Sequence, residues 1–170
     1  MILCRGQSTR GDALEERPRL LYSRPVRDDA SRSWTLRCDG GARGNPGPGA
    51  AAYVLLDSGG RETEARGEFL GTVTNNVAEY RALISGLDAA LRLGAESLVV
   101  YMDSELVVRQ MKGEYRVKNQ GLKPLHLSAC DRASKFRHVR FVAVRREDNA
   151  RADQLVNETL DGILGSESPR

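Results

Sequence analysis

Arg37-Cys38-Asp39-Gly40-Gly41-Ala42-Arg43-Gly44-Asn45-Pro46-Gly47-Pro48-Gly49 is the stretch that decides the fold of this 170-residue chain. It lies between two apolar runs, and its glycines and prolines are typical of a turn between two strands. Asp39 stands where the first run ends, and the glycines after it leave its carboxylate open to a ligand. Taken alone, the stretch favours a glycine-rich hairpin with a solvated aspartate. Whether Asp39 has a functional role depends on the other predicted elements.

The composition is that of a globular protein, with 40% hydrophobic and 29% charged residues. No apolar run approaches the roughly 20 residues that span a bilayer. The three cysteines, Cys4, Cys38 and Cys130, are too widely spaced for a zinc cluster or a disulfide framework. We therefore expect a cytoplasmic protein with no membrane partner. The net charge of +3 permits a polyanionic partner.

The chain divides into three predicted segments. Residues 1–32 are polar, charged and without a sustained period, which predicts a poorly ordered leader. Residues 33–163 carry all the periodic elements and form the predicted domain. Residues 164–170 are expected to be a flexible tail.

Hydrophobic periodicity predicts strands over 33–38, 50–56 and 61–70, joined by short turns into an antiparallel meander. Apolar residues at three- and four-residue spacing then predict a helix over 75–93. The later elements are strand 97–102, helices 104–112 and 122–136, strand 139–144 and helix 149–160. This order predicts an α/β fold whose five-stranded mixed sheet, a meander plus parallel strands, is flanked by helices.

Four acids fall on elements that can converge. Asp39 ends the first strand and Asp103 directly follows strand 97–102, so parallel pairing of these strands would set the two carboxylates side by side. Glu79 and Asp153 lie at the edges of the apolar faces of their helices, where burial of a charge is costly. A cap or surface role explains any one of these acids, but a cluster explains all four better.

Such a cluster repels itself unless divalent cations neutralise it. No histidine or cysteine accompanies the four acids, which favours Mg²⁺, or Mn²⁺ as the alternative, over zinc. Two ions about 3.5–4 Å apart suit in-line displacement at a phosphate. The four acids are therefore candidate metal ligands.

Four motifs follow one another in the chain: Cys38-Asp39-Gly40-Gly41 through Gly49, Thr74-Asn75-Asn76-Val77-Ala78-Glu79-Tyr80, Tyr101-Met102-Asp103-Ser104-Glu105, and Arg146-Glu147-Asp148-Asn149-Ala150-Arg151-Ala152-Asp153. In this order they resemble type 1 ribonuclease H (ribonuclease HI), over about residues 33–161. The resemblance implies a ribonuclease H-like fold and an endonuclease that cuts the RNA strand of RNA–DNA hybrids with two Mg²⁺ ions, leaving 5′-phosphate products. It also implies catalytic, metal-binding roles for Asp39, Glu79, Asp103 and Asp153.

The resemblance further implies a set of substrate contacts. The matching positions here are Gly40, Gly41, Asn45, Asn75 and Asn76. Contacts in the minor groove are physically sensible, because an A-like duplex displays there the 2′-OH that separates RNA from DNA. Asn75 is equally placed to cap the helix that it begins.

Two features depart from many relatives. The loop before the last helix, residues 143–148, lacks their catalytic histidine, which leaves Arg145 or Arg146 to orient the phosphate or product. Residues 112–123 are short and without tryptophan, where many relatives carry a basic, tryptophan-rich protrusion. This compact form resembles a subgroup found in bacteria and archaea, and its hold on substrate should weaken readily with salt.

Two alternatives stay open. Proofreading-type exonucleases share the fold, but they place a second acid two residues after the first, where this chain has Gly41. The other is a non-catalytic binder of RNA–DNA hybrid or double-stranded RNA. The four intact acids count against it, because a pure binder has no need of a repulsive cluster. Double-stranded RNA also stays open as a second substrate.

Overall fold

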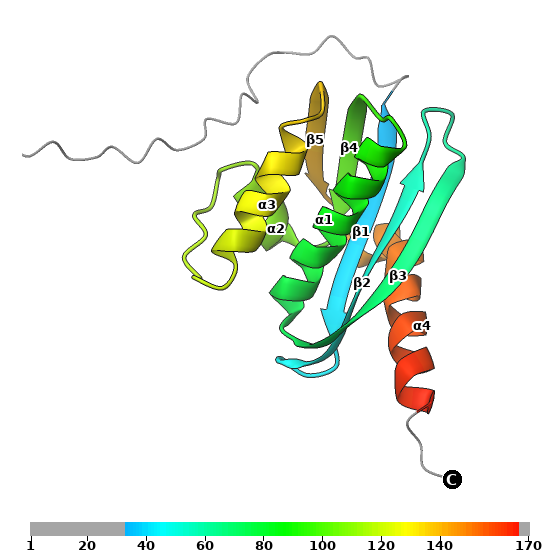
Figure 1. Ribbon diagram of the computed structural model, residues 1–170, viewed down its shortest axis with the longest axis vertical. Coiled ribbons are helices and arrows are strands. Elements are labelled where there is room, and N and C mark those ends of the chain that lie inside the picture. The colour runs from blue at the N-terminus through cyan, green and yellow to red at the C-terminus, as the bar shows by residue number, and fades with distance from the viewer. Residues whose placement is uncertain (1–32, 167–170) are drawn as a thin grey trace, which may run out of the picture.

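The structure is a computed structural model that describes residues 33–166, so the predicted leader lies outside the described residues. Figure 1 shows one sheet with helices on both faces. In chain order the elements are β1 (Trp34–Ala42), β2 (Gly47–Leu56), β3 (Glu62–Val73), α1 (Asn75–Arg92), β4 (Ser97–Met102), α2 (Glu105–Met111), α3 (Lys123–Ala133), β5 (His138–Ala143), the 3₁₀ turn η2 (Arg146–Asn149) and α4 (Ala150–Ser166).

The sheet has the strand order β3-β2-β1-β4-β5. β1 pairs antiparallel with β2, and β2 with β3, while β1 with β4 and β4 with β5 are parallel. The predicted meander followed by parallel strands is therefore confirmed. The crossovers through α1 and through α2–α3 place these helices on one face of the sheet.

Both faces of β2 are buried, which explains its nearly continuous apolar sequence. Ala51, Tyr53 and Leu55 belong to the large core beneath α1, whereas Ala50 and Ala52 join a small cluster with Val156 and Leu160 of α4. The two cores fix α1 and α4 on opposite faces (Figure 1). The elements that carry Glu79 and Asp153 are thereby held on either side of β1.

The helix termini follow the sequence closely. The Oγ of Thr74 accepts a hydrogen bond from the N–H of Val77 at the start of α1, and Ser104 caps α2 in the same way through Val107. Gly94 follows α1 with a φ of 81°, a left-handed conformation that glycine adopts without strain. No helix among residues 33–166 is long and apolar enough to cross a membrane.

The main difference from the prediction concerns the first strand. It was expected to end at Cys38, but β1 continues to Ala42, so Asp39 lies inside a strand rather than at its end. The parallel pairing with β4 does stop at Cys38, opposite Met102, while the antiparallel pairing with β2 goes on to Ala42. Gly40 and Gly41, which suggested a turn, are paired with Ala51 and Ala50 of β2 instead, and Gly40 also lets α1 approach closely.

Candidate active site

Asp39 and Asp103 lie side by side at the end of the parallel ladder between β1 and β4. Cys38 is opposite Met102 in that ladder, and each aspartate is the next residue along its strand. Asp39 is only 8% exposed. Burial, followed by the charges of Asp103 and Asp153, raises its pKa to about 7. The expected adjacency of Asp39 and Asp103 is thus confirmed.

Glu79 reaches the same place because α1 packs directly against Gly40. A Cβ at position 40 would lie 2.2 Å from the carbonyl carbon of Ala78 and 2.4 Å from the nitrogen of Glu79. The Glu79 carboxylate accepts a hydrogen bond from the Oγ of Ser104, which follows Asp103. Burial raises the pKa of Glu79 to about 7; the Ser104 hydrogen bond opposes this shift, and the charges of Asp103 and Asp39 add to it.

Asp153 approaches from the opposite face, in the first turn of α4. Its Oδ1 accepts a hydrogen bond from Nε of Arg146 at 2.9 Å, and its Oδ2 accepts one from Nδ2 of Asn157 at 3.2 Å. The Arg146 charge also lowers the pKa of Asp39, although burial and the other acids outweigh it. Arg146 therefore pairs with Asp153 and also acts through its charge on Asp39 and Asp103.

Asn149 joins the two halves of the site. Its side chain is fully buried, and Nδ2 donates to the carbonyl of Cys38 at 2.8 Å and to Oδ1 of Asp103 at 3.4 Å. Within residues 33–166 its Oδ1 has no hydrogen-bond partner. The sequence analysis predicts Asn149 only as the first residue of a helix, because the contact with Cys38 spans 111 residues of chain. The pairing of Arg146 with Asp153 was also missed.

The predicted substrate contacts separate into two groups. Asn45 and Asn75 lie together: Oδ1 of Asn75 accepts from the N–H of Ala42 at 2.8 Å, and Oδ1 of Asn45 accepts from the N–H of Asn75 at 3.2 Å. These bonds tie the β1–β2 turn to the start of α1, and Asn76 is the next residue. Gly40, in contrast, is buried beneath α1, where the lack of a side chain lets the helix approach; its contact with substrate stays a prediction.

Gly41 is half-buried on the opposite side of β1. A Cβ there would meet only the side chain of Val156, at 3.6 Å, which is ordinary contact. The two neighbouring glycines therefore face different helices and differ in how much space surrounds them.

The donor chemistry of the site fits a hard divalent cation. The four acids and the unpartnered Oδ1 of Asn149 are all oxygen acceptors, and burial and the neighbouring carboxylates raise the pKa of Asp39 and of Glu79. As placed, Glu79 is held by Ser104 and Asp153 by Arg146. Accordingly, in the described part of the chain no three acidic, thiol or imidazole groups already form a metal-coordinating set. The residues fit the ion by charge and donor type.

The chain is similar in sequence to known proteins over most of the described residues. A family model described as reverse transcriptase-like matches residues 37–159. The curated ribonuclease H of Hydrogenovibrio crunogenus is 35% identical over 144 residues, which cover 76% of this chain and 97% of that protein. A bifunctional protein of Mycobacterium tuberculosis is 44% identical over 132 residues, or 77% of this chain. The alignment covers 36% of that protein, so the chain spans little more than a third of its length.

Solved structures agree with these sequence matches. The N-terminal ribonuclease H domain of the Mycobacterium tuberculosis protein superposes with a TM-score of 0.77 at 40% identity, over 81% of this chain and 99% of that one. Ribonuclease H1 of the archaeon Halobacterium salinarum gives 0.74 at 36% identity, over 76% and 98%. A ribonuclease H1 isolated from compost, solved in complex with an RNA/DNA hybrid, gives 0.74 at 41%, over 78% and 99%.

Proposed function

The chain belongs to the ribonuclease H1 family, and on that premise we propose that it hydrolyses the RNA strand of RNA–DNA hybrids and leaves 5′-phosphate products. The observation that carries the proposal is the convergence of four acids from β1, α1, β4 and α4. A relative of 41% identity is described in complex with an RNA/DNA hybrid, which supports the substrate class.

Asp39, Glu79, Asp103 and Asp153 are the proposed catalytic residues and would hold two Mg²⁺ ions, with Mn²⁺ as the alternative. When bound, these ions would supply an activated water and neutralise the departing 3′ oxygen. Because the pKa values of Asp39 and Glu79 are each raised to about 7, these carboxylates are partly protonated near neutral pH when no cation is present. A divalent cation and those protons therefore compete for the same oxygens.

Arg146 is the proposed positioning residue where relatives carry a histidine. It pairs with Asp153, and its charge also acts on Asp39. An arginine at this point orients a carboxylate and can attract the phosphate or product, and it stays protonated throughout the working pH range. Arg145 is the weaker candidate, because it pairs with Glu147 at 3.6 Å and not with one of the four acids.

The proposed contacts to the hybrid are Asn45, Asn75 and Asn76, together with the backbone of Gly40 and Gly41 beside the acids. The hydrogen bonds of Asn75 with Asn45 and with the N–H of Ala42 fix the turn relative to α1, so Asn45 and Asn75 form one pre-organised patch. Such a patch suits the minor groove, where the 2′-OH is exposed. We keep residues 33–163 as the proposed catalytic domain, with a leader before it and a tail after it.

We place the reaction in the cytoplasm, because the two cysteines in the described residues, Cys38 and Cys130, are free thiols. The alternative function is a non-catalytic binder of hybrid or double-stranded RNA. The raised pKa values of Asp39 and Glu79 count against a pure binder. They reflect the free-energy cost of burying acids close together, which binding alone does not require.

The test is a panel of four labelled substrates: RNA–DNA hybrid, double-stranded RNA, double-stranded DNA and single-stranded RNA. Each is incubated with Mg²⁺, Mn²⁺ or EDTA, and the product termini are identified. The proposal expects cutting of the RNA in the hybrid, dependent on a divalent cation, with 5′-phosphate ends. Binding of the hybrid without any cutting would favour the binder instead.

A further inference from the structure

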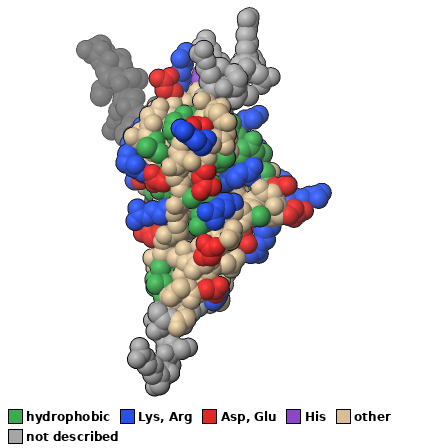
Figure 2. Space-filling view, turned by 90° about the vertical axis from the view of Figure 1, so that its right-hand side faces the viewer, with side chains coloured by type: hydrophobic (Ala, Val, Ile, Leu, Met, Phe, Trp, Pro, Cys, Tyr) green, Lys and Arg blue, Asp and Glu red, His purple; other side chains and the backbone are tan. Residues whose placement is uncertain are grey.

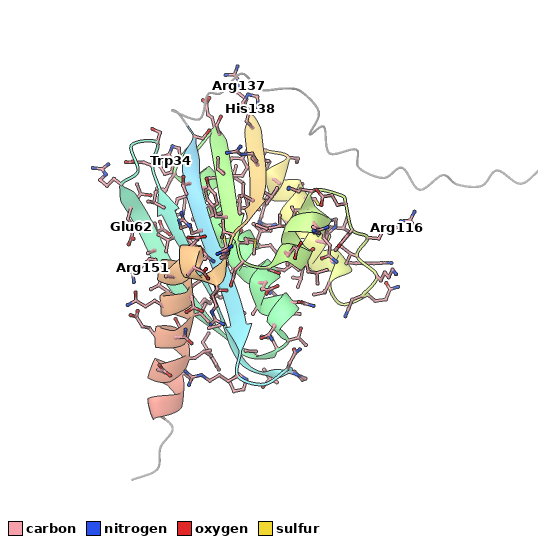
Figure 3. The ribbon with its side chains drawn as sticks, turned by 180° about the vertical axis from the view of Figure 1, so that it is seen from behind. Trp34, Glu62, Arg116, Arg137, His138 and Arg151 are labelled. Carbon is pink, nitrogen blue, oxygen red and sulfur yellow. The ribbon has the colours of Figure 1, made fainter. Side chains whose placement is uncertain are left out.

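One face of the sheet is left uncovered over β1, β4 and β5. The inward residues of these strands, Leu36, Val100 and Phe141, form one row in the core beneath α1. On the other face α4 covers β2, β3 and part of β1, and Figure 3 shows the remaining strands without a helix in front of them. The outward positions of this open face are Ser33, Thr35, Arg37, Ser97, Val99, Tyr101, His138, Arg140 and Val142.

The charge of the open face is of one sign. Its nine outward positions include Arg37, Arg140 and His138 but no acid. Arg140 is exposed, and among residues 33–166 it has no carboxylate partner. Arg37 lies over the ring of Tyr101, 4.9 Å from its centroid, and donates to the backbone carbonyl of Asp148 rather than to a carboxylate.

The opposite edge of the molecule differs. Figure 2 looks onto the side that carries β3 and α4, and there acidic and basic side chains are interspersed. Several of them pair: Arg92 with Glu64 at 2.6 Å, and Arg151 with Glu62 at 3.7 Å. The nine outward positions of the open face therefore carry basic side chains with no acid between them, unlike this edge.

The open face leads directly to the candidate active site. Arg37 precedes Asp39 by two residues and Tyr101 precedes Asp103 by two, on the same side of their strands. At about 3.3 Å per residue, the Arg37–Tyr101 pair lies roughly 7 Å from the acids along the sheet. Arg140 belongs to the next row, beside Val99, and His138 with Arg137 stands at the far end (Figure 3).

We propose that this open face binds single-stranded RNA that continues beyond the hybrid from the strand being cut. The inference rests on the proposed function, since the acids act on the RNA strand and the face begins where they lie. A flat sheet surface that combines cations with an aromatic ring is the usual platform for a single strand, because the phosphates meet the cations and a base can stack, here on the Arg37 guanidinium that lies over the Tyr101 ring. RNA overhangs would thus tighten binding.

The test is fluorescence anisotropy with the full chain in EDTA, so that binding is measured without cutting. The probes are a blunt hybrid, the same hybrid with an RNA overhang of about six nucleotides at either end, and matched DNA overhangs. An RNA overhang at one end should tighten binding several-fold. Arg140→Gln should remove that gain and lower the slope of log Kd against log salt by about 0.7, the value for one phosphate contact.

Arg66→Gln is the matched control, because Arg66 is an exposed arginine on β3, at the other edge of the sheet. It should leave the overhang gain intact. The proposal is overturned if neither RNA overhang helps, if DNA overhangs help as much, or if the two variants behave alike. A change of oligomeric state in Arg140→Gln, measured by light scattering, would assign the face to a second copy of the chain and also overturn it.

Different results would overturn the open-face proposal and the proposed function. If the wild-type chain cuts a blunt hybrid with Mg²⁺ but gains nothing from an overhang, only the open-face proposal is wrong. If it cuts no hybrid at all, the proposed function is wrong whatever the binding data show.

Discussion

Gly40 and Ala78 are in backbone contact, and this contact sets the distance between β1 and α1. A Cβ at position 40 would fall 2.2 Å from the Ala78 carbonyl carbon, and a backbone atom cannot swing aside as a side chain can. We predict that Gly40→Ala costs at least about 3 kcal/mol in the free energy of unfolding, at the upper end of overpacking effects. It should also displace Glu79 and lower activity.

Gly41→Ala is the matched control for urea unfolding, because the new methyl group would make only an ordinary contact with Val156 at 3.6 Å. It should change the free energy of unfolding by less than about 1 kcal/mol. Equal stability of the two variants would show that α1 does not depend on this close approach.

Much of this arrangement could be predicted from local pattern. Alternation and helical spacing located the strands and helices, and parallel pairing implied that Asp39 and Asp103 are neighbours, because these signals are carried by residues close in sequence. The continuation of β1 through Gly40 could not be predicted, since glycine signals both turns and close packing. The contacts of Asn149 and the pairing of Arg146 with Asp153 could not be predicted for another reason: they depend on where η2 lies against β1, which only the tertiary structure fixes.

Arg146 competes with a cation for Asp153. Because its guanidinium donates to Oδ1 of Asp153, Arg146→Gln should lower the Mg²⁺ concentration needed for half-maximal cleavage. It should also reduce kcat by about tenfold or more, since a charge aimed at the reacting phosphate is lost. The measurement is a Mg²⁺ titration of hybrid cleavage. Arg145→Gln, which removes an exposed arginine paired with Glu147, should change both values less than about twofold; the same response in both variants would contradict the role given to Arg146.

The Ser104 side chain contacts both Glu79 and the start of α2. Its hydroxyl donates to the Glu79 carboxylate and caps α2, and the first of these bonds opposes the rise in the pKa of Glu79. Ser104→Ala should therefore move the acid limb of the pH–rate profile to higher pH, and the lost cap should cost about 1 kcal/mol of stability. Ser104→Thr keeps the hydroxyl and should restore the profile. An unshifted acid limb in the alanine variant would mean that Ser104 acts only on the helix.

The stability of the metal-free protein should fall as pH rises. Folding raises the pKa of Asp39 from 3.8 and that of Glu79 from 4.5, each to about 7. The folded state therefore binds more protons than the unfolded state between these values, and stability is lost as pH rises through that window. Between about pH 5 and about pH 8 in EDTA, we expect a loss on the order of a few kcal/mol.

Thermal unfolding in EDTA and in Mg²⁺ measures this effect. Mg²⁺ should restore stability at high pH, where the acids are ionised, and have little effect at low pH. Asp39→Asn should flatten the pH dependence, because the amide carries no charge. A metal-free protein that becomes more stable toward high pH would contradict the burial and repulsion described for these two carboxylates.

The central claim, that the four converging acids cut the RNA of a hybrid, is tested most directly by cleavage of one end-labelled hybrid in Mg²⁺ by three proteins. The wild type and Asp131→Asn, whose aspartate is exposed on α3 and pairs with Lys135, should cut equally well. Asp39→Asn should keep the wild-type circular dichroism spectrum and lose cleavage by at least about a thousandfold. Undiminished cutting by folded Asp39→Asn would contradict the account.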